Sequence, residues 1–241
     1  MNLFRVVESM SKERPIIFSA PMVQAILDGR KTQTRRAVTL PHANPLGAWE
    51  PMTIGGPNGG RTKAGDIIPD QGAIWHTRTG ECLASPYGQP GDRLWVREAF
   101  HTSPHFTCLY RADYDDDARP AKVVASGGWK PSIHMPRRLS RIDLEITGIR
   151  VERLQDISRE DAIAEGIEPT HIDWLGRQQW RVYPHQDGTP GEEVATYVGR
   201  PTTSRPIDSY KSLSLSINGP GSWDRNPFVW VIEFRSLADG R

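Results

Sequence analysis

The alternation of apolar and polar residues in the segment RIDLEITGIRVERL, residues 141–154, is the feature that most constrains the fold. Ile142, Leu144 and Ile146 share one side of an extended chain, because successive side chains of a β-strand point to opposite faces. Gly148 follows this run, and we expect the chain to turn there before the alternation resumes. A half-buried strand of this kind must pair with others, so the chain is predicted to build a sheet.

Other segments of strand type are short and spread over the whole chain. They lie at residues 16–18, 94–100, 107–114 and 227–237. Two short helices are expected among them, and no internal repeat is visible. Short strands with few helices predict an α+β fold, a small mixed β-barrel with short flanking helices, rather than a doubly wound sheet.

Terminal residues mark both expected helices. The first has Pro21 in its first turn and Gly29 just past its end, which are positions that these residues favour. The second is expected over about 159–165. Ser158, followed three residues later by an aspartate, resembles a capping box, and Gly166 is a natural stop.

Glycine and proline concentrate between these elements. The 241 residues include 22 Gly and 20 Pro, and a chain of this length is long for one domain and short for two. We therefore predict an N-terminal extension over residues 1–13 and a single domain over residues 14–241. Two stretches without periodicity, about 39–90 and 168–222, are interpreted as long loop insertions into that domain, which can act as lids.

Charge is almost balanced, with 30 Lys and Arg against 29 Asp and Glu, and the net charge is +1. No overall electrostatic attraction to RNA or to an acidic membrane is expected from this balance. Contact with RNA would need a local cluster, such as Arg137, Arg138 and Arg141. A solvated face is the plainer interpretation of the same three residues.

Several site and targeting signals are missing from the sequence. Cys82 and Cys108 are too few for a disulfide framework or a zinc site, and the histidines show no metal-binding spacing. Neither a P-loop nor a glycine-rich dinucleotide motif is present, so no cofactor and no metal are expected. No apolar run reaches the roughly 20 residues that span a bilayer, and the N-terminus lacks the apolar core of a signal peptide. The sequence favours a cytoplasmic protein without a membrane partner.

The segment ILDGRKTQTRR combines one lysine with three arginines and two threonines. A hydroxyl becomes a good nucleophile when a base removes its proton, and Lys31 can be that base for Thr34 if burial or nearby cations lower its pKa. Arg30, Arg35 and Arg36 are such cations. In a regular strand Lys31 and Thr34 would point to opposite faces, so the pair requires a chain that is still turning after the glycine. The alternative is a solvated basic turn at the negative end of a helix dipole.

Glu165 is the second candidate for chemistry. It ends the second expected helix, directly before Gly166. The negative end of the helix dipole disfavours a carboxylate there, and a carboxyl group that keeps its proton can act as a general acid. An ordinary exposed glutamate at a helix end is the alternative.

Two further residues are candidates for contact with a ligand. Arg97 follows a barrel-type strand and can either line a pocket with Trp95 or form an ion pair on the surface. His134 can contact the ring of a substrate, although a single histidine is more often structural.

Three segments together resemble one known family, the ASCH-domain proteins of the PUA-like superfamily. ILDGRKTQTRR is similar to their helix that ends in glycine and continues as Lys-Thr-x-Thr-Arg, PGDRLWVRE to their Gly-Asp turn into a strand, and PFVWVIEF to their closing strand. The resemblance covers residues 14–38, 90–167 and 223–237 and leaves both insertions outside. The segments PSIHMPR and INGPGSWDRNPFVWVIEF also resemble long phage and prophage members.

This resemblance implies an activity. A small bacterial enzyme of the family is an N4-acetylcytidine amidohydrolase, and its Lys-Thr-x-Thr motif matches Lys31 and Thr34. Its glutamate corresponds by position to Glu165, with Glu160 as the nearest competitor. The resemblance therefore implies that Lys31 takes the proton of Thr34, that Thr34 attacks the acyl group on the N4 amine of cytosine, and that Glu165 protonates the departing amine.

The same resemblance implies residues that bind the substrate. Arg35 or backbone N–H groups of the turn would stabilise the oxyanion. Ser132 or His134 would contact the base, and Arg97 completes the predicted substrate-binding set. The substrate would be a small nucleoside or nucleobase, or RNA that carries it, and no metal or cofactor is implied.

Two other functions stay open at this point. PUA-like modules can bind RNA or modified nucleotides without chemistry, and some ASCH proteins are ribonucleases, in which Lys31 and the arginines would serve phosphate chemistry. The sequence does not determine the preferred acyl group, the carrier of that group or the oligomeric state.

Overall fold

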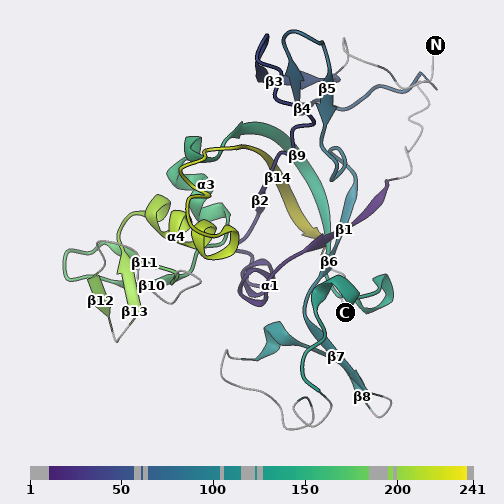
Figure 1. Cartoon of the computed structure of the whole chain (residues 1–241). Helices are drawn as coiled ribbons and strands as arrows, with labels where there is room; N and C mark the ends of the chain where they lie inside the picture. Colours follow the sequence, from purple (N-terminus) through teal and green to yellow (C-terminus); the bar gives the residue numbers. More distant parts are fainter. Residues whose placement is uncertain are drawn as a thin grey trace, which may run out of the picture.

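The structure of the chain, a computed structural model, describes residues 11–56, 61, 65–103, 106–114, 123, 127–184, 195–197 and 200–237. Most of the N-terminal extension predicted over residues 1–13 lies outside the described residues, and the first strand already begins at Glu13. The described part of the chain is mostly strand, with three short helices around one five-stranded sheet (Figure 1). The predicted α+β class is confirmed.

Strands from both ends of the chain build the five-stranded sheet, in the order β1-β6-β9-β14-β2. They are β1 (Glu13–Ile17), β6 (Arg93–Arg97), β9 (Asp143–Arg153), β14 (Phe228–Leu237) and β2 (Gln33–Ala37). β1 and β6 run parallel, and the other neighbours are antiparallel. The last strand of the chain, β14, therefore lies between β9 and β2, and its first five residues are buried on both faces of the sheet.

Strand β9 corrects one prediction. It continues through Gly148 without a turn, as one strand of 11 residues. Opposite this glycine the register of β14 shifts between Glu233 and Phe234, and a Cβ at Gly148 would lie 2.7 Å from Oε2 of Glu233. Glycine leaves room here for an irregularity in the partner strand, which is why a residue that often ends a strand lies inside one.

The two edges of the sheet, β1 and β2, do not pair with each other, and no closed barrel forms among the described residues. A side chain crosses between the edges instead, because Nη2 of Arg36 donates to the carbonyl oxygen of Ile17 at 2.6 Å. The sheet is thus open where a closed barrel was predicted. Local alternation predicts strands, whereas closure depends on the tilt and stagger of the whole sheet.

Both expected helices form where they were predicted. α1 (Ala20–Leu27) joins β1 to β2, with Pro21 in its first turn and Gly29 after its end at φ 71°. Ser158 caps α3 (Arg159–Ala164), since its hydroxyl accepts a hydrogen bond from the N–H of Asp161 at 3.0 Å. Glu165, on which the helix was expected to end, is the C-cap residue directly after Ala164.

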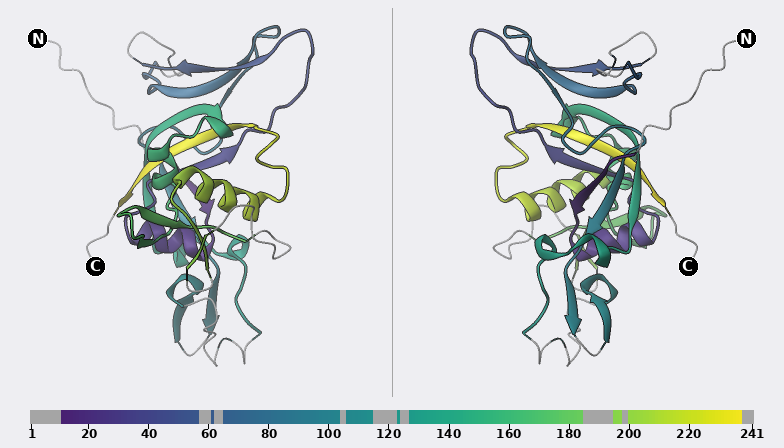
Figure 2. Two further views of the ribbon diagram at one scale, coloured as in Figure 1. Left: turned by 90° about the vertical axis from the view of Figure 1, so that its left-hand side faces the viewer. Right: turned by 90° about the vertical axis from the view of Figure 1, so that its right-hand side faces the viewer.

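The first predicted insertion, residues 39–90, contains a sheet of its own. β3 (Trp49–Ile54), β4 (Gln71–His76) and β5 (Cys82–Ala84) form an antiparallel sheet at the top of Figures 1 and 2. It packs on β9, where a Cβ at Gly72 would lie 2.6 Å from the Cα of Arg150. The interpretation as a long loop is wrong, and the strands escaped it because neither β3 nor β4 alternates between buried and exposed residues.

The second predicted insertion, residues 168–222, also contains regular structure. β10 (Pro169–Ile172), β11 (Gln178–Arg181), β13 (Arg200–Thr203) and β12 (Ala195–Tyr197) form a four-stranded sheet in that order. α4 (Pro206–Asn218) follows them and packs against α3. Ile207, Tyr210, Leu213 and Ile217 of α4 have an apolar spacing typical of a helix. Serine, which favours caps and turns over helices, is frequent in α4 and hid this spacing in the sequence.

The two remaining strands form a hairpin at the opposite end of the molecule from the β3–β4–β5 sheet (Figure 2). They are β7 (Phe100–Ser103) and β8 (Phe106–Tyr110). The strand predicted over residues 107–114 therefore ends at Tyr110, where a 3₁₀ turn over Arg111–Asp113 begins. Within the described ranges, no helix is long and apolar enough to cross a membrane.

Candidate active site

The chain turns tightly between α1 and β2. After Gly29, the backbone N–H groups of Arg30 and Lys31 both donate to the carbonyl oxygen of Ala25, at 2.8 and 2.9 Å. Regular strand pairing starts only with the first residue of β2. The chain is therefore still turning at Lys31, and Lys31 and Thr34 line the same pocket.

The same turn is held against the end of α3. The N–H of Thr32 donates to the carbonyl oxygen of Ala164 at 2.9 Å, and Lys31 forms an isolated antiparallel bridge with Glu165. Gly166, at φ 84°, allows this close approach, since a Cβ there would lie 2.7 Å from the Cβ of Lys31. Two segments 134 residues apart in sequence are thus brought into direct contact.

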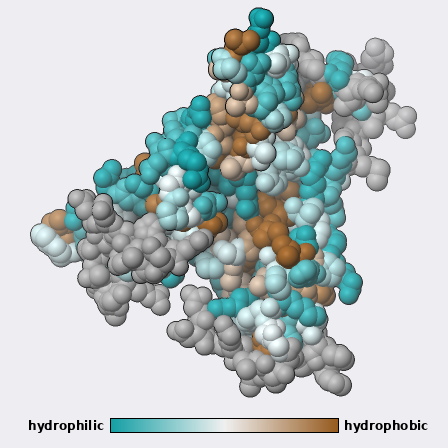
Figure 3. Space-filling view, viewed as in Figure 1, coloured by the Kyte–Doolittle hydropathy of each residue, from teal (hydrophilic) through white to brown (hydrophobic). Residues whose placement is uncertain are grey.

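A pocket of about 660 Å³ opens between the end of β1 and the edge strand β2, and α4 supplies one of its walls. Its polar lining includes Lys31, Thr34, Arg35, Arg36, Glu165 and Tyr210. Its apolar lining includes Phe18, Met22, Leu154, Leu213, Ile217 and Val229. Figure 3 shows apolar residues gathered in the middle of one face of the molecule, near the junction of β1 and α1. A mostly apolar pocket of this size with a few convergent polar groups is typical of a small-molecule site.

Lys31 is almost completely buried, with 4% of its surface exposed. Its Nζ donates to Oε2 of Glu165 at 3.0 Å and to the carbonyl oxygen of the same residue at 2.8 Å. Burial lowers the pKa of Lys31, because the ammonium form loses its hydration. The Glu165 carboxylate opposes this shift, whereas Arg36 and Arg35 add to it. Of the two causes expected from the sequence, burial and nearby cations, burial therefore has the larger effect on the pKa of Lys31.

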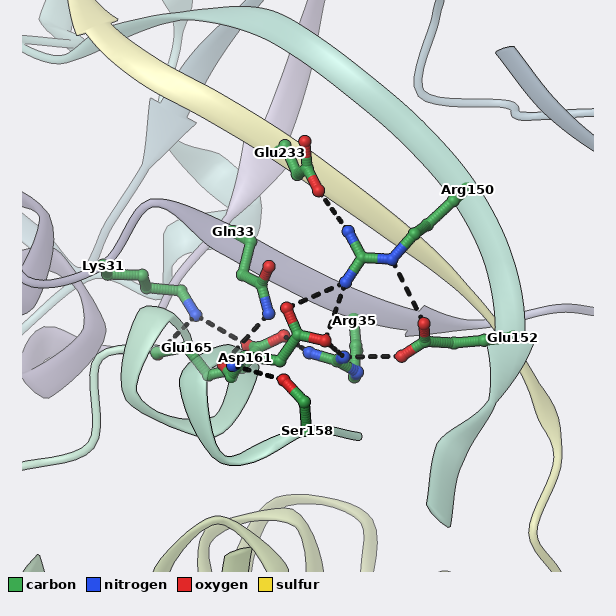
Figure 4. A network of polar contacts seen from close by, with 9 residues as sticks. All are labelled: Lys31, Gln33, Arg35, Arg150, Glu152, Ser158, Asp161, Glu165 and Glu233. Atoms are coloured by element: carbon green, nitrogen blue, oxygen red, sulfur yellow. Dashed lines mark hydrogen bonds and ion pairs between the residues drawn. The ribbon is translucent and has the colours of Figure 1, made fainter. Parts of the chain in front are cut away.

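Glu165 is 3% exposed and contacts two cations at once. Its Oε2 accepts from Lys31, and its Oε1 accepts from Nη1 of Arg35 at 3.0 Å. Nη2 of Arg35 also donates to Glu152 at 2.5 Å and to Asp161 at 3.0 Å (Figure 4). The Arg35 side chain is only 1% exposed, so a fully buried guanidinium links three carboxylates.

The network extends to Arg150 (Figure 4), whose side chain is partly exposed. Its guanidinium donates to both carboxylate oxygens of Asp161 at 2.9 Å, to Glu152 at 3.1 Å, and to Glu233. Burial disfavours the charged form of Asp161, but hydrogen bonds from Arg150 and Arg35 outweigh it and lower the pKa of Asp161. Because each charge has several partners, the geometry of the pocket wall is fixed by the whole network.

Thr34 is 4% exposed and lines the pocket. Among the described residues its hydroxyl makes no hydrogen bond, and Lys31 donates to Glu165 rather than to Thr34. The Thr34 hydroxyl is therefore free to meet a ligand in the pocket.

The other predicted substrate-binding residues separate into two groups. Ser132, which begins a 3₁₀ turn over Ser132–His134, lines the pocket together with Arg35. Arg97 does not line it, and its guanidinium lies 5.6 Å over the Trp95 ring and donates to a backbone carbonyl. His134 is exposed and also lies outside the pocket lining.

Two charged neighbours of the site, Glu160 and Arg30, do not line the pocket. Glu160, in the first turn of α3, is exposed and does not line the pocket, so the geometry favours Glu165 over it. Arg30 forms an ion pair with Asp28 at 2.9 Å.

Sequence reasoning missed the wall that α4 supplies. Tyr210, Leu213 and Ser214 lie on this helix and line the pocket. Apolar spacing was present as a signal for the helix, but a helical pattern does not tell which distant segment it covers. Among the described residues, no group of three or more His, Cys, Asp or Glu is placed to hold a metal ion.

Comparison with known proteins adds no identification. No protein-family model matches the chain, and no significant match is found among curated proteins or solved structures. The function has to be inferred from the chemistry of the pocket and from the sequence resemblance.

Proposed function

We propose that this protein is an amidohydrolase that removes an acyl group from the exocyclic N4 amine of a cytosine or cytidine derivative. The observation that carries the proposal is that Lys31, Thr34 and Glu165, all three of them buried, line one pocket. The same three residues are those that the ASCH resemblance implies. We further propose that the chain belongs to this PUA-like group and that its five-stranded sheet corresponds to the group's barrel left open at one seam, which the Arg36 side chain spans.

Lys31 and Glu165 form the acid–base pair of the proposed reaction. Nζ and Oε2 share a hydrogen bond at 3.0 Å, so a proton can pass between them without movement of the backbone. Transfer to Oε2 leaves a neutral amine and a carboxylic acid, which are the forms that a general base and a general acid need. The burial that lowers the pKa of Lys31 favours the neutral amine.

In the acylation step, the neutral amine of Lys31 takes the proton of Thr34, and Oγ1 of Thr34 forms a bond to the acyl carbon. The electron pair of the carbonyl moves onto its oxygen. When the tetrahedral intermediate collapses, the bond from carbon to N4 breaks, and N4 takes the proton of Glu165. Lys31 is then an ammonium ion and Glu165 a carboxylate, and the free base departs.

Water completes the cycle. The Glu165 carboxylate accepts a proton from water as the water oxygen attacks the acyl-threonine ester. Lys31 returns its proton to Oγ1 of Thr34 as that oxygen leaves, and the carboxylic acid is released. All three side chains regain their starting forms, so Lys31 and Glu165 together gain and lose no net proton over the whole reaction.

Hydrolysis of defined substrates tests the proposal. The purified protein is incubated with N4-acetylcytidine, with a longer N4-acylcytosine derivative and, separately, with single-stranded RNA. We expect release of cytidine or cytosine by the wild type and its loss in Lys31→Ala and Thr34→Ala. A matched pair on one helix completes the set: Glu165→Gln should be inactive, and Glu160→Gln, which changes an exposed glutamate outside the pocket, should keep the wild-type rate.

The rival functions give different results in the same assay. Cleavage of RNA with untouched nucleosides would support the ribonuclease and contradict the amidohydrolase. Binding of N4-acetylcytidine without turnover would support a binding module of the PUA-like type and also contradict it.

A further inference from the structure

Acyl transfer needs a hydrogen-bond donor for the oxygen on which negative charge develops. The donors expected from the sequence are already engaged. The backbone N–H groups of Arg30, Lys31 and Thr32 donate to carbonyl oxygens of α1 and α3. Both terminal nitrogens of Arg35 donate to carboxylates, and its Nε, although unpartnered among the described residues, is enclosed by protein atoms.

The hydroxyl of Tyr210, on α4, is a donor that remains available. Tyr210 is 6% exposed and lines the same pocket as Lys31, Thr34 and Glu165. In the part of the chain that the structure describes, its hydroxyl makes no hydrogen bond. The hydroxyl is not among the side-chain atoms that the protein encloses without a partner, so it is accessible and can donate to a ligand in the pocket that Tyr210 lines.

Tyr210 also lies beside the charged groups of the site. The guanidinium carbon of Arg35 is 5.8 Å from the centre of its ring. Burial raises the pKa of Tyr210 well above its ordinary value, and the negative charge of Glu165 raises it further. The hydroxyl therefore keeps its proton at neutral pH and serves as a donor rather than as a base.

We propose that the hydroxyl of Tyr210 donates a hydrogen bond to the acyl oxygen of the substrate and stabilises the oxyanion that forms there. This role rests on the proposed amidohydrolase function and adds a fourth catalytic residue to it. The proton stays on Tyr210 throughout: the hydrogen bond strengthens while the electron pair rests on oxygen and weakens when the carbonyl re-forms. Because α4 lies outside the segments that resemble the ASCH family, the catalytic site of this chain is completed by its second insertion.

Tyr210→Phe tests the role, because it removes the hydroxyl and keeps the ring. We expect kcat for N4-acetylcytidine to fall by about 100-fold, the usual loss for one oxyanion donor, with KM nearly unchanged. Tyr183→Phe is the matched control. Tyr183 is also buried, and its hydroxyl accepts a hydrogen bond from the backbone N–H of Glu168 at 3.1 Å, away from the pocket lining. This control should keep the wild-type kcat.

A second measurement compares the affinities for the substrate and for a phosphonamidate analogue of the tetrahedral intermediate. A purely structural role of Tyr210 would leave the ratio of these two affinities unchanged. Tyr210→Phe should lose most of the preference that the wild type shows for this analogue over the substrate. A Tyr210→Phe enzyme with the kcat and the analogue preference of the wild type would overturn the oxyanion role and leave the amidohydrolase standing. Equal losses of affinity for substrate and analogue would also overturn it, since they indicate a disturbed pocket. A wild type that releases no cytidine or cytosine from either acylated substrate would instead show that the proposed function itself fails.

Discussion

Nζ of Lys31 lies 3.0 Å from Oε2 of Glu165, although 134 positions separate the two residues in the chain. The contact joins the turn after α1 to the end of α3 and lies on the pocket wall. Removing one partner of a buried ion pair leaves an uncompensated charge, which typically costs about 3–5 kcal/mol. Substitutions at either residue therefore affect both stability and activity. For each such variant, the free energy of unfolding and the activity both have to be measured.

The pH dependence of the activity should report on Lys31. Burial lowers its pKa below the ordinary value of 10.5, and only the neutral amine can act as the base. The pair must also keep the one proton that Glu165 gives to N4. We therefore expect kcat/KM for N4-acetylcytidine to fall as pH rises through the lowered pKa, because the pair then has no proton left for the departing amine. Initial rates at constant ionic strength measure this, and a kcat/KM that stays constant up to pH 10.5 would contradict the shared proton.

The same shift should make stability depend on pH. The charged form of Lys31 is penalised in the folded protein, so between its lowered pKa and 10.5 the folded state binds fewer protons than the unfolded state. The free energy of unfolding should therefore increase as pH rises through this window and decrease as pH falls through the lowered pKa. Urea unfolding of the wild type and of Lys31→Met isolates the effect. The stability of the wild type relative to Lys31→Met should grow with pH, and a difference that shrinks instead would count against a lowered pKa.

Arg35→Lys should be strongly destabilising despite the retained charge. A lysine cannot reproduce the fork that joins Glu152, Asp161 and Glu165, and we expect a loss of about 3 kcal/mol in the free energy of unfolding. Arg235→Lys is the control, because Arg235 forms an ion pair with Glu145 while its side chain is 66% exposed. Such surface pairs contribute about 0–1 kcal/mol. Similar losses for both variants in urea unfolding would contradict the special role of the buried guanidinium.

Gly166→Ala should disturb both the fold and the base. The backbone there has φ 84°, and the new Cβ would lie 2.7 Å from the Cβ of Lys31. Gly176→Ala is a matched control, since Gly176 has φ 77° but no atom within 4 Å of the position of the new Cβ. The control should lose about 1–2 kcal/mol from backbone strain alone, and Gly166→Ala should lose a further 1–3 kcal/mol, about the usual cost of overpacking. Activity should fall only in Gly166→Ala. If both variants lose equal stability and keep their activity, the close packing of Gly166 on Lys31 has no influence on the site.

The elements nearest to the site were predictable because local chemistry marks them. Pro21, Gly29 and Ser158 each have a fixed preference for a helix end, and both helices lie where these residues place them. Gly148 shows the limit of such rules. Its effect depends on the partner strand, where the register shifts beside Glu233, and a local pattern contains no information about that partner.

The same limit applies to the candidate site: residues in locally marked segments could be predicted, and a residue placed by long-range packing could not. Lys31 and Thr34 lie in one short motif, and Glu165 ends a helix with clear boundaries, so all three could be named from the sequence. Tyr210 could not, because its position follows from the packing of α4 against α3. Arg97 and His134 were expected at the substrate and lie outside the pocket lining, since residue type alone does not tell which way a side chain faces.

The place of β14 in the sheet has a consequence for synthesis on the ribosome. β2, which carries Thr34 and Arg35, pairs along its backbone with β14 alone in the five-stranded sheet, and β14 spans Phe228–Leu237. Contacts between segments so distant in sequence form late, because the intervening chain must first be made and brought back. A nascent chain therefore has no partner for this edge strand until β14 has emerged, and the wall of the pocket that β2 forms should take its final shape only then.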